Sequence, residues 1–225
     1  MKPFTIAIDG PAGAGKSTIA RLVAAALQYI YIDTGAMYRA VAWKVQAEKI
    51  ALTNEARIIS LVEKLSLRLT SIDGKTRVFA DGNDISETIR NPEISRLVPV
   101  VAAIAGVRKI LLAMQQEMAE CGGVVMDGRD IGTAVLPNAE IKIFLTASIE
   151  ERAKRRWLEL TNNGFTCSLE ELMQEIAARD KQDYERETAP LRQAEDAVLI
   201  DTTGLTIKEV TAAILGVAER RENLV

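Results

Sequence analysis

Residues 10–18 read GPAGAGKST and directly follow the short apolar run 4–8. The spacing from Gly10 to Lys16 and Ser17 matches G-x-x-x-x-G-K-[ST], a pattern that binds nucleotide phosphates. Glycines let consecutive backbone N–H groups point at phosphate oxygens, and the helix that follows presents its positive dipole end to the same anion. The lysine reaches the β- and γ-phosphates, and the serine hydroxyl is a ligand for Mg²⁺. The segment therefore predicts a site for a nucleoside triphosphate.

A phosphate loop of this kind occurs in kinases, GTPases, motors and ATP-driven regulators, so it does not by itself define a reaction. GTPases carry an Asn-Lys-x-Asp segment that reads the base, and this sequence has none. We expect the whole loop to contact the triphosphate, namely Gly10, Pro11, Ala12, Gly13, Ala14, Gly15, Lys16, Ser17 and Thr18.

Three further groups of residues could bind a second, anionic substrate. Residues 33–39 read DTGAMYR and residues 127–130 read DGRD, and each group ends or follows a short apolar run. Arg179, Asp183 and Arg186 are spaced i, i+4 and i+7, which predicts one shared helix face. Arginine matches phosphate oxygens with two parallel hydrogen bonds, and a carboxylate accepts from amino and hydroxyl groups. Taken alone, these groups are equally consistent with helix caps, turns or an exposed ion-pair ladder.

The densest basic run of the sequence is RAKRR at residues 152–156. Arg152 and Arg156 share a helix face, and residues 162–164 then interrupt the helical pattern before Ser168. Two helices joined by a turn, with arginines on the first, are typical of a lid that closes over a triphosphate. A solvated basic helix face is the alternative.

Composition excludes several other chemistries. The chain has 225 residues, 28 Lys+Arg, 31 Asp+Glu and no histidine, so it contains no Ser-His triad and no histidine metal site. The formal net charge of −3 argues against general binding to nucleic acid or anionic membranes. Cys121 and Cys167 are far apart and lack a CxxC partner, so we expect neither a disulfide framework nor a zinc site. With no signal peptide and no apolar run near about 18 residues, we predict a cytoplasmic protein without a membrane span.

Five short apolar runs precede turns and predict strands that are buried on both faces of a sheet. They are residues 4–8, 29–32, 124–126, 141–145 and 198–200. Helical stretches lie between them, and three of these begin with a capping box, at Ser148, Ser168 and Thr206. This alternation predicts an α/β fold with a parallel sheet and helices on both faces.

Residues 65–84 break the alternation. Leucines alternate at 65, 67 and 69, and the pairs Asp73-Gly74 and Asp81-Gly82 are typical of antiparallel hairpins. We interpret the stretch as an insertion into the parallel fold. Because no repeat or linker marks a second independent domain, we predict a single structural unit.

Four motifs together make the sequence resemble the bacterial cytidylate kinase family. They are GPAGAGKST, DTGAMYR, DGRDIG at residues 127–132 and RDKQDYER at residues 179–186. They span nearly the whole chain, so the resemblance is specific. It implies a P-loop NTPase-type core at residues 1–35 and 105–225, with a helical lid at about 150–170 and a monophosphate-binding insert at 36–104 that contains the hairpin.

The activity that the resemblance implies is transfer of the ATP γ-phosphate to CMP or dCMP, giving CDP or dCDP, in pyrimidine nucleotide metabolism. Mg²⁺ would be the cofactor, with Ser17 as its ligand. ATP and the monophosphate would be the partners of a monomer, with no nucleic acid or membrane.

The resemblance also implies the roles of individual residues. Arg108 and Asp130 would read the base, because a carboxylate accepts from the cytosine amino group and meets a lone pair in uracil, a difference of about 1–3 kcal/mol. Arg179 and Asp183 would approach the ribose. The implied substrate-binding set is Thr34, Tyr38, Arg39, Arg108, Arg129, Asp130, Arg179, Asp183 and Arg186. The implied catalytic set is Lys16, Arg129, Arg152, Arg156 and Arg186.

Some assignments stay open. Asp33 or Asp127 could order magnesium-bound water or simply cap a helix. Where the family commonly has a serine that helps to hold the nucleoside, this chain has Pro99, and Ala105 replaces a frequent proline. Proline donates no hydrogen bond and does not fit easily inside a helix. The preference for base or sugar is therefore in question, and Ser95 is the candidate that could compensate.

Two rival functions remain. One is another small P-loop kinase, acting on UMP, dTMP, AMP or shikimate. The other is a nucleotide-binding regulatory module without transfer activity, in which the hairpin is a partner surface and the basic run binds RNA. The acidic net charge and the lack of interleaved basic and aromatic residues count against RNA.

Overall fold

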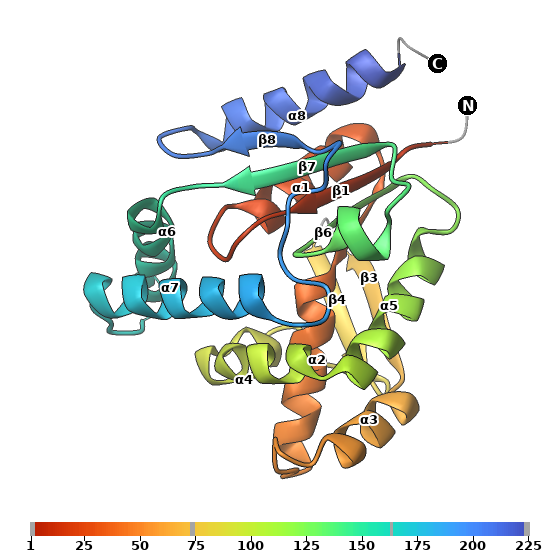
Figure 1. The fold of residues 1–225 in the computed structure, drawn as a ribbon, viewed down its shortest axis with the longest axis vertical. Helices are drawn as coiled ribbons and strands as arrows, with labels where there is room; N and C mark the ends of the chain where they lie inside the picture. Colours follow the sequence, from red (N-terminus) through yellow and green to blue (C-terminus); the bar gives the residue numbers. More distant parts are fainter. Residues whose placement is uncertain (1–2, 73–74, 163, 223–225) are drawn as a thin grey trace.

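The computed structural model describes residues 3–72, 75–162 and 164–222. The larger of its two sheets has five strands and lies in the upper part of Figure 1. The strands are ordered β2-β6-β1-β7-β8, and every neighbouring pair is parallel, as predicted. Ligands of such sheets bind beyond the carboxyl ends of the strands. The strand bounds are Thr5–Asp9 for β1, Ile30–Asp33 for β2, Val124–Gly128 for β6, Ile141–Thr146 for β7 and Val198–Asp201 for β8.

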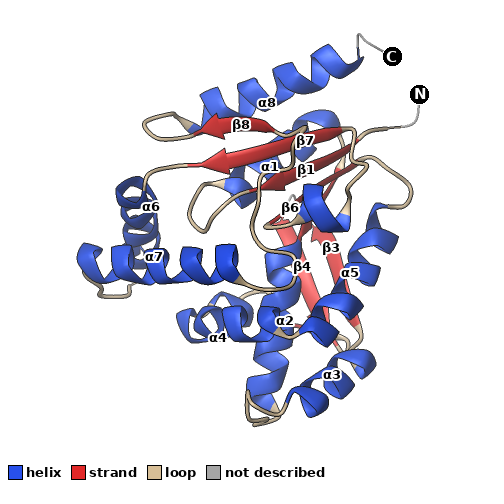
Figure 2. Ribbon diagram, in the orientation of Figure 1, coloured by secondary structure: helices blue, strands red, loops and turns tan. Residues whose placement is uncertain are grey.

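Helices cover both faces of the sheet (Figure 2). Successive side chains of a strand point to opposite faces. Ile6 and Ile8 of β1 pack in a buried cluster with α1 (Lys16–Leu27) and α8 (Ile207–Glu222). Ala7 lies in a different cluster, with side chains from α5 (Ala105–Ala119) and from the π-helix at 131–135. The central strand is therefore buried on both sides, which confirms the predicted fold class.

The prediction of burial on both faces is wrong for the two outer strands. In β8, Val198 is 42 % exposed and Leu199 is 54 % exposed, and in β2 Ile30 is 62 % exposed. Both strands form the edges of the sheet, where one side has no further strand. An apolar run of a few residues does not distinguish an edge strand from a central one.

A second group of elements follows β2 and precedes β6 in the sequence. A buried cluster joins α2, α3, α4, α5 and β4. The predicted hairpin is present, since β3 and β4 pair antiparallel and a short β5 extends them. Asp81 and Gly82, between β4 and β5, have φ of +51° and +82°, as a type I′ turn requires; Asp73-Gly74 lies outside the described residues. The bounds are Thr34–Ala47 (α2), Glu55–Lys64 (α3), Leu67–Ile72 (β3), Lys75–Ala80 (β4), Asn83–Asp84 (β5), Thr88–Arg90 (a 3₁₀ turn) and Pro92–Ala103 (α4).

Pro99 lies inside α4, although proline was expected to fit poorly there. It removes the hydrogen bond that residue 99 would give to the carbonyl of Ser95. Among the described residues, no single helix has the length and apolar composition needed to cross a membrane. The successive helices α4 and α5 meet that test only as a pair, and they are bent by 98° relative to each other.

Two helices, α6 (Ile149–Asn162) and α7 (Leu169–Glu185), pack against each other beside the sheet. Ser168 and Glu171 form the complete predicted capping box at the start of α7. Ser148 caps α6 through the amide of Glu151, but the Glu151 carboxylate instead pairs with Arg155. The two helices share a small apolar cluster that consists of Ala153, Leu160, Leu172 and Ile176.

Candidate active site

The predicted phosphate loop connects the central strand β1 to α1. Gly10 has φ +147°, and a Cβ there would lie 1.9 Å from the Leu145 carbonyl oxygen, so this position accepts only glycine. Gly15 caps α1, and no side chain caps this helix. The first N–H groups of α1 therefore remain available to an anion.

Lys16 lies under this loop with only 5 % of its surface exposed. Its ammonium donates a 2.7 Å hydrogen bond to the Pro11 carbonyl. Burial, together with the charge of Arg129, lowers the pKa of Lys16 to about 7, and the charge of Asp127 opposes this shift. A bound polyphosphate would supply the negative charge that this buried ammonium lacks.

Asp127 links the loop to the neighbouring strands at their carboxyl-terminal ends. Its carboxylate accepts from the Ser17 hydroxyl at 2.9 Å and from the Tyr31 hydroxyl at 2.7 Å. Burial raises the pKa of Asp127 to about 6, and the charge of Asp33, its partner in register, adds to this effect. Sequence reasoning missed Tyr31, because a tyrosine inside a predicted strand carries no signal of its own.

Of the two roles expected for it, Asp33 has that of a helix cap. Its carboxylate caps α2 by accepting from the Ala36 amide at 2.8 Å, and it pairs with Arg39 at 2.9 Å. Asp127 caps no helix and instead holds Ser17.

The donors near Ser17 suit a cation that keeps most of its ligands outside the protein. Within the described part of the chain, no group of three or more His, Cys, Asp or Glu side chains could hold a metal. Mg²⁺ is usually bound by one or two protein oxygens together with phosphates and water. The hydroxyl of Ser17 and the carboxylate of Asp127 fit that donor set.

Arginines and carboxylates alternate among the predicted acceptor residues. Arg108 pairs with Asp130, and both side chains are nearly inaccessible to solvent. Arg186 pairs with the other Asp130 oxygen at 3.1 Å and with Asp183 at 3.7 Å. Arg129 closes the series on Asp183 at 2.8 Å. Three segments that are distant in sequence thus form one buried charge network, which we call the arginine–carboxylate chain.

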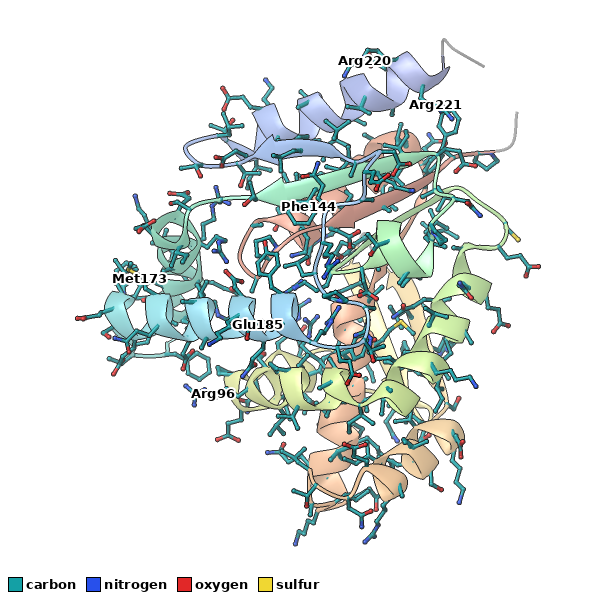
Figure 3. All side chains as sticks on the ribbon, viewed as in Figure 1. Arg96, Phe144, Met173, Glu185, Arg220 and Arg221 are labelled. Carbon is teal, nitrogen blue, oxygen red and sulfur yellow. The ribbon has the colours of Figure 1, made fainter. Side chains whose placement is uncertain are left out.

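The predicted shared helix face is only partly correct. Arg179 and Asp183 lie in α7, but the helix ends at Glu185 and Arg186 lies just beyond it in extended backbone. Burial alone would raise the pKa of Asp183, but Arg129 and Arg179 lower it below its usual value. Figure 3 shows side chains filling the space between β7, marked by Phe144, and the end of α7, marked by Glu185.

The remaining predicted acceptor residues lie around the start of α2. The Thr34 hydroxyl donates to the Asp127 carbonyl at 2.7 Å. Tyr38 lies under the Arg108 guanidinium, 5.7 Å from it, and burial raises the pKa of Tyr38 to about 12. Arg39 and Arg179 each have a buried Nε that finds no hydrogen-bond partner among the residues that the structure describes. Arginines in this state are ready to donate to an anionic ligand.

A cavity of about 220 Å³ borders the arginine–carboxylate chain. Gln115 lines it and is only 2 % exposed. Its buried Nε2 has no hydrogen-bond partner within the described part of the chain. Sequence reasoning did not select this residue. The lining consists of Tyr38, Ala105, Arg108, Lys109, Leu112, Gln115, Asp130, Ala134, Val135, Thr188 and Ala189.

The basic run on α6 is not a uniformly solvated face. Arg152 is buried and donates to the Ala12 carbonyl of the phosphate loop at 3.1 Å, while it pairs with Asp180 of α7 at 2.7 Å. Arg155, which was not among the predicted site residues, donates to the carbonyl and hydroxyl of Thr202. Arg156 is 30 % exposed and pairs with Glu159. Arg152 and Arg155 thus attach α6 to the phosphate loop and to the end of β8.

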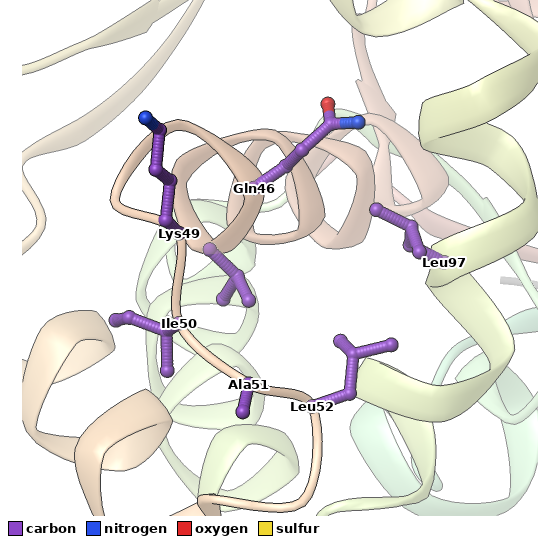
Figure 4. Close-up of a pocket in the computed structure, with 7 residues that line it drawn as sticks. Gln46, Lys49, Ile50, Ala51, Leu52 and Leu97 are labelled. Carbon is purple, nitrogen blue, oxygen red and sulfur yellow. The ribbon is translucent and has the colours of Figure 1, made fainter.

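A second hollow, of about 360 Å³, lies apart from these residues at the end of α2 (Figure 4). Its lining is mostly apolar and includes Ile50, Leu52 and Leu97, with Lys49 as its one charged member. None of the predicted site residues lines it.

Comparisons with known proteins give matches over almost the whole chain. The family model described as "Cytidylate kinase" matches residues 6–220. Proteins named "Cytidylate kinase" from Bacillus thuringiensis (strain Al Hakam) and Bacillus cereus (strain AH187) are 51 % identical over 216 residues, which is 96 % of this chain and 96 % of each relative.

Solved structures with low sequence identity share the fold. A gluconokinase from Sinorhizobium meliloti 1021 matches 99 % of this chain and 96 % of its own, with a TM-score of 0.51 and 18 % identity. An uncharacterized protein from Eubacterium ventriosum ATCC 27560 matches 97 % and 99 %, with a TM-score of 0.55 and 11 % identity. Since the family model and the Bacillus relatives match almost end to end, the chain belongs to the cytidylate kinase family.

Proposed function

We propose that this enzyme transfers the γ-phosphate of ATP to CMP or dCMP, giving CDP or dCDP. One observation carries the proposal: the phosphate loop and the arginine–carboxylate chain meet beyond the carboxyl-terminal ends of the same parallel strands. Asp127 contacts Ser17 of the loop, and Arg129 and Asp130 follow it directly in sequence. A donor site and an acceptor site are thereby adjacent in one chain.

On the donor side, the loop amides and Lys16 hold the triphosphate. Lys16 exchanges its bond to the Pro11 carbonyl for phosphate oxygens, and the first amides of α1 donate to the same group. Mg²⁺, when bound through Ser17 and ordered by Asp127, neutralises part of the phosphate charge. The serine and the carboxylate keep each other oriented for this through their 2.9 Å hydrogen bond.

On the acceptor side, Arg39, Arg129 and Arg186 hold the monophosphate, and Arg108 with Asp130 reads the base. Tyr38 and Thr34 shape the wall behind them, and Arg179 with Asp183 approaches the ribose. The acceptor oxygen is already anionic near neutral pH, so in-line attack needs position and charge neutralisation rather than a general base. The absence of histidine is therefore no obstacle.

We propose that residues 36–104 form the acceptor-binding insert and that α6 and α7 act as the lid. Arg152 already contacts the Ala12 carbonyl, so a movement of the phosphate loop would act on α6 through this hydrogen bond. Arg156, at the more exposed end of the run, would exchange its ion pair with Glu159 for the transferred phosphoryl group. Lid arginines neutralise charge that develops there during transfer.

We also propose a monomer that works in the cytoplasm. Every residue of the proposed site comes from one chain. Cys121 and Cys167 are free thiols, which suits a reducing compartment.

A panel of acceptors tests the proposed reaction. The enzyme is given ATP and Mg²⁺ with CMP, dCMP, UMP, dTMP, AMP or shikimate, and ADP release is measured for each. We expect CMP and dCMP to give the highest kcat/KM. Fastest turnover with another acceptor would refute the substrate assignment, and ATP binding without ADP release for any acceptor would favour a regulatory module.

A further inference from the structure

Asp9 is a buried carboxylate for which neither the reaction nor the sequence motifs require a role. It is the last residue of the central strand β1, it is 4 % exposed, and it directly precedes the phosphate loop. It does not contact the loop lysine or the serine through any hydrogen bond that the described residues show. Its partners lie on the acceptor side of the site.

Both oxygens of Asp9 accept hydrogen bonds from consecutive backbone amides. The Ile131 amide donates to one oxygen at 2.8 Å, and the Gly132 amide donates to the other at 2.7 Å. These are the first two residues of the π-helix, whose initial amides lack partners within the helix. More than a hundred residues separate the carboxylate from the amides that it holds.

The two amides immediately follow Asp130, the carboxylate that pairs with Arg108 and Arg186. The backbone before Asp130 is fixed as well, because Gly128 lies opposite Asp9 in the parallel register of β1 and β6. Asp130 therefore stands between two backbone anchors on the same residue of β1. A π-helix is a rare and irregular turn that is common at functional sites, and here it needs an external acceptor for its first amides.

Burial, two amide hydrogen bonds and two neighbouring charges act on the Asp9 carboxylate. Burial raises its pKa to about 6, the two amide hydrogen bonds lower it, Asp130 raises it, and Lys16 lowers it. A buried carboxylate without partners is costly, so the site exists only because the amides compensate the loss of water. The residue is thus tied to the geometry of the turn rather than placed there by chance.

We propose that Asp9 is a positioning residue that holds the base-reading Asp130 in place and so couples the acceptor site to the root of the phosphate loop. This inference rests on the proposed function, since it takes CMP as the acceptor. Asp9 does not touch either nucleotide. Its loss acts through the turn at Ile131 and Gly132.

The test compares Asp9→Asn with the wild-type enzyme by separate calorimetric titrations with CMP and with a non-hydrolysable ATP analogue. Asparagine keeps the shape of the side chain, but its carboxamide NH₂ replaces one acceptor oxygen. That NH₂ faces a backbone N–H, so one of the two hydrogen bonds is lost. We expect the Kd for CMP to rise about tenfold, the loss of roughly one hydrogen bond to a charged group. The Kd for the ATP analogue should stay within about twofold. Equal weakening of both ligands, or of neither, would overturn the proposal.

A double-mutant cycle shows whether Asp9 acts through Asp130. If it does, Asp9→Asn adds no further loss of CMP affinity once Asp130→Asn is present. Additive losses would contradict the proposed route. Wild-type enzyme that binds no CMP would instead refute the proposed function, so the two failures are distinguishable.

Two controls address folding. Ile214→Val, in the α8 core remote from the site, lowers stability without altering either Kd. If Asp9→Asn does not fold, Gly132→Ala is the second variant: its Cβ would lie 3.1 Å from the Lys142 side chain and 3.4 Å from the Asp9 carboxylate, so the crowding falls on the residue whose amide Asp9 holds. An unchanged CMP affinity in that variant would then count against the proposal.

Discussion

The donor side and the acceptor side of this site are built in different ways. The donor side is one continuous loop, whose backbone and single lysine supply the positive groups. The acceptor side is a chain of alternating arginines and carboxylates from α5, from the turn after β6 and from the end of α7. A backbone cradle keeps its donors whatever happens elsewhere, whereas the arginine–carboxylate chain depends on the position of every member.

The difference has an energetic side as well. Buried arginines that pair with carboxylates are already compensated, so a ligand phosphate must compete with Asp130 and Asp183 for them. Among the described residues, the Lys16 ammonium has a carbonyl as its one hydrogen-bond partner, so a triphosphate gains more from it. We therefore expect changes on the donor side to affect turnover, and changes on the acceptor side to affect affinity and selectivity.

Lys16→Met should have the largest effect, because it removes the one charge of the donor cradle and keeps the aliphatic stem. We expect kcat to fall about 10³-fold, the scale of losing a preorganised group that stabilises transition-state charge. Steady-state kinetics measures the loss, and calorimetry should find CMP affinity unchanged. A parallel loss of CMP binding would show that the two sides are not separable in this way.

Arg152→Ala tests the junction between the proposed lid and the phosphate loop. It leaves the carboxylate of Asp180 buried without its partner, which should lower the free energy of unfolding by about 3 kcal/mol. Arg156→Ala is the matched control on the same helix, with an expected change of less than about 1 kcal/mol because its ion pair is exposed. Urea denaturation measures both, and similar losses would refute the distinction between a buried and a surface arginine.

Asp130→Asn should break the acceptor side selectively. It withdraws the charge shared by Arg108 and Arg186, and we expect the KM for CMP to rise about 10- to 100-fold, equivalent to about 1–3 kcal/mol. The KM for ATP should change by no more than about twofold. Asp196→Asn, which removes an exposed pair with Lys142, is the control and should change neither constant.

The pH dependence of stability tests the link between the two sides. The pKa of Asp9 is raised from 3.8 to about 6, so between these values the folded protein binds more protons than the unfolded chain. Asp9 therefore favours folding at low pH, and this advantage is lost as the pH rises from about 4 to 6. Relative to Asp9→Asn, the wild-type free energy of unfolding should fall by about 2 kcal/mol across that window.

Urea denaturation without nucleotides measures this difference. Asp127 titrates in the same range, but it is present in both proteins and cancels in the comparison. If the difference in unfolding free energy between wild type and Asp9→Asn stays constant from pH 4 to 7, ionisation of Asp9 does not destabilise the folded protein.

The donor side was predictable because its chemistry lies in consecutive residues. The loop, its helix and the central strand follow from local spacing and from an apolar run. The acceptor side was predictable only through the resemblance, since no local pattern indicates that Arg108 and Arg186 share Asp130. Arg152 and Arg155 also donate to the backbone carbonyls of Ala12 and Thr202, and a backbone carbonyl carries no residue-type signal.

Errors of prediction also follow from physics. Val198 and Leu199 form an apolar run that predicts a buried strand, but their exposure depends on the order of strands in the sheet. Pro99 should disfavour a helix interior, but the packing of Val98 and Val101 in the insert core overrides that local preference. Asp9 could have been singled out, as a carboxylate between a buried strand and a phosphate loop, yet its partners become visible only in three dimensions.

Pro99→Ser should have the smallest effect and sharpens the account of the acceptor side. The change supplies the serine hydroxyl that the family resemblance implies at this position, and it restores an amide that can donate to the Ser95 carbonyl. One neutral hydrogen bond is worth about 0.5–1.5 kcal/mol, so we expect the KM for CMP to fall about two- to fivefold with kcat unchanged. Pro99→Ala repairs the helix without adding the hydroxyl, and it should raise thermal stability while leaving that KM unchanged. If both variants lower the KM equally, the gain comes from the geometry of α4, and the hydroxyl is not a nucleoside ligand in this chain.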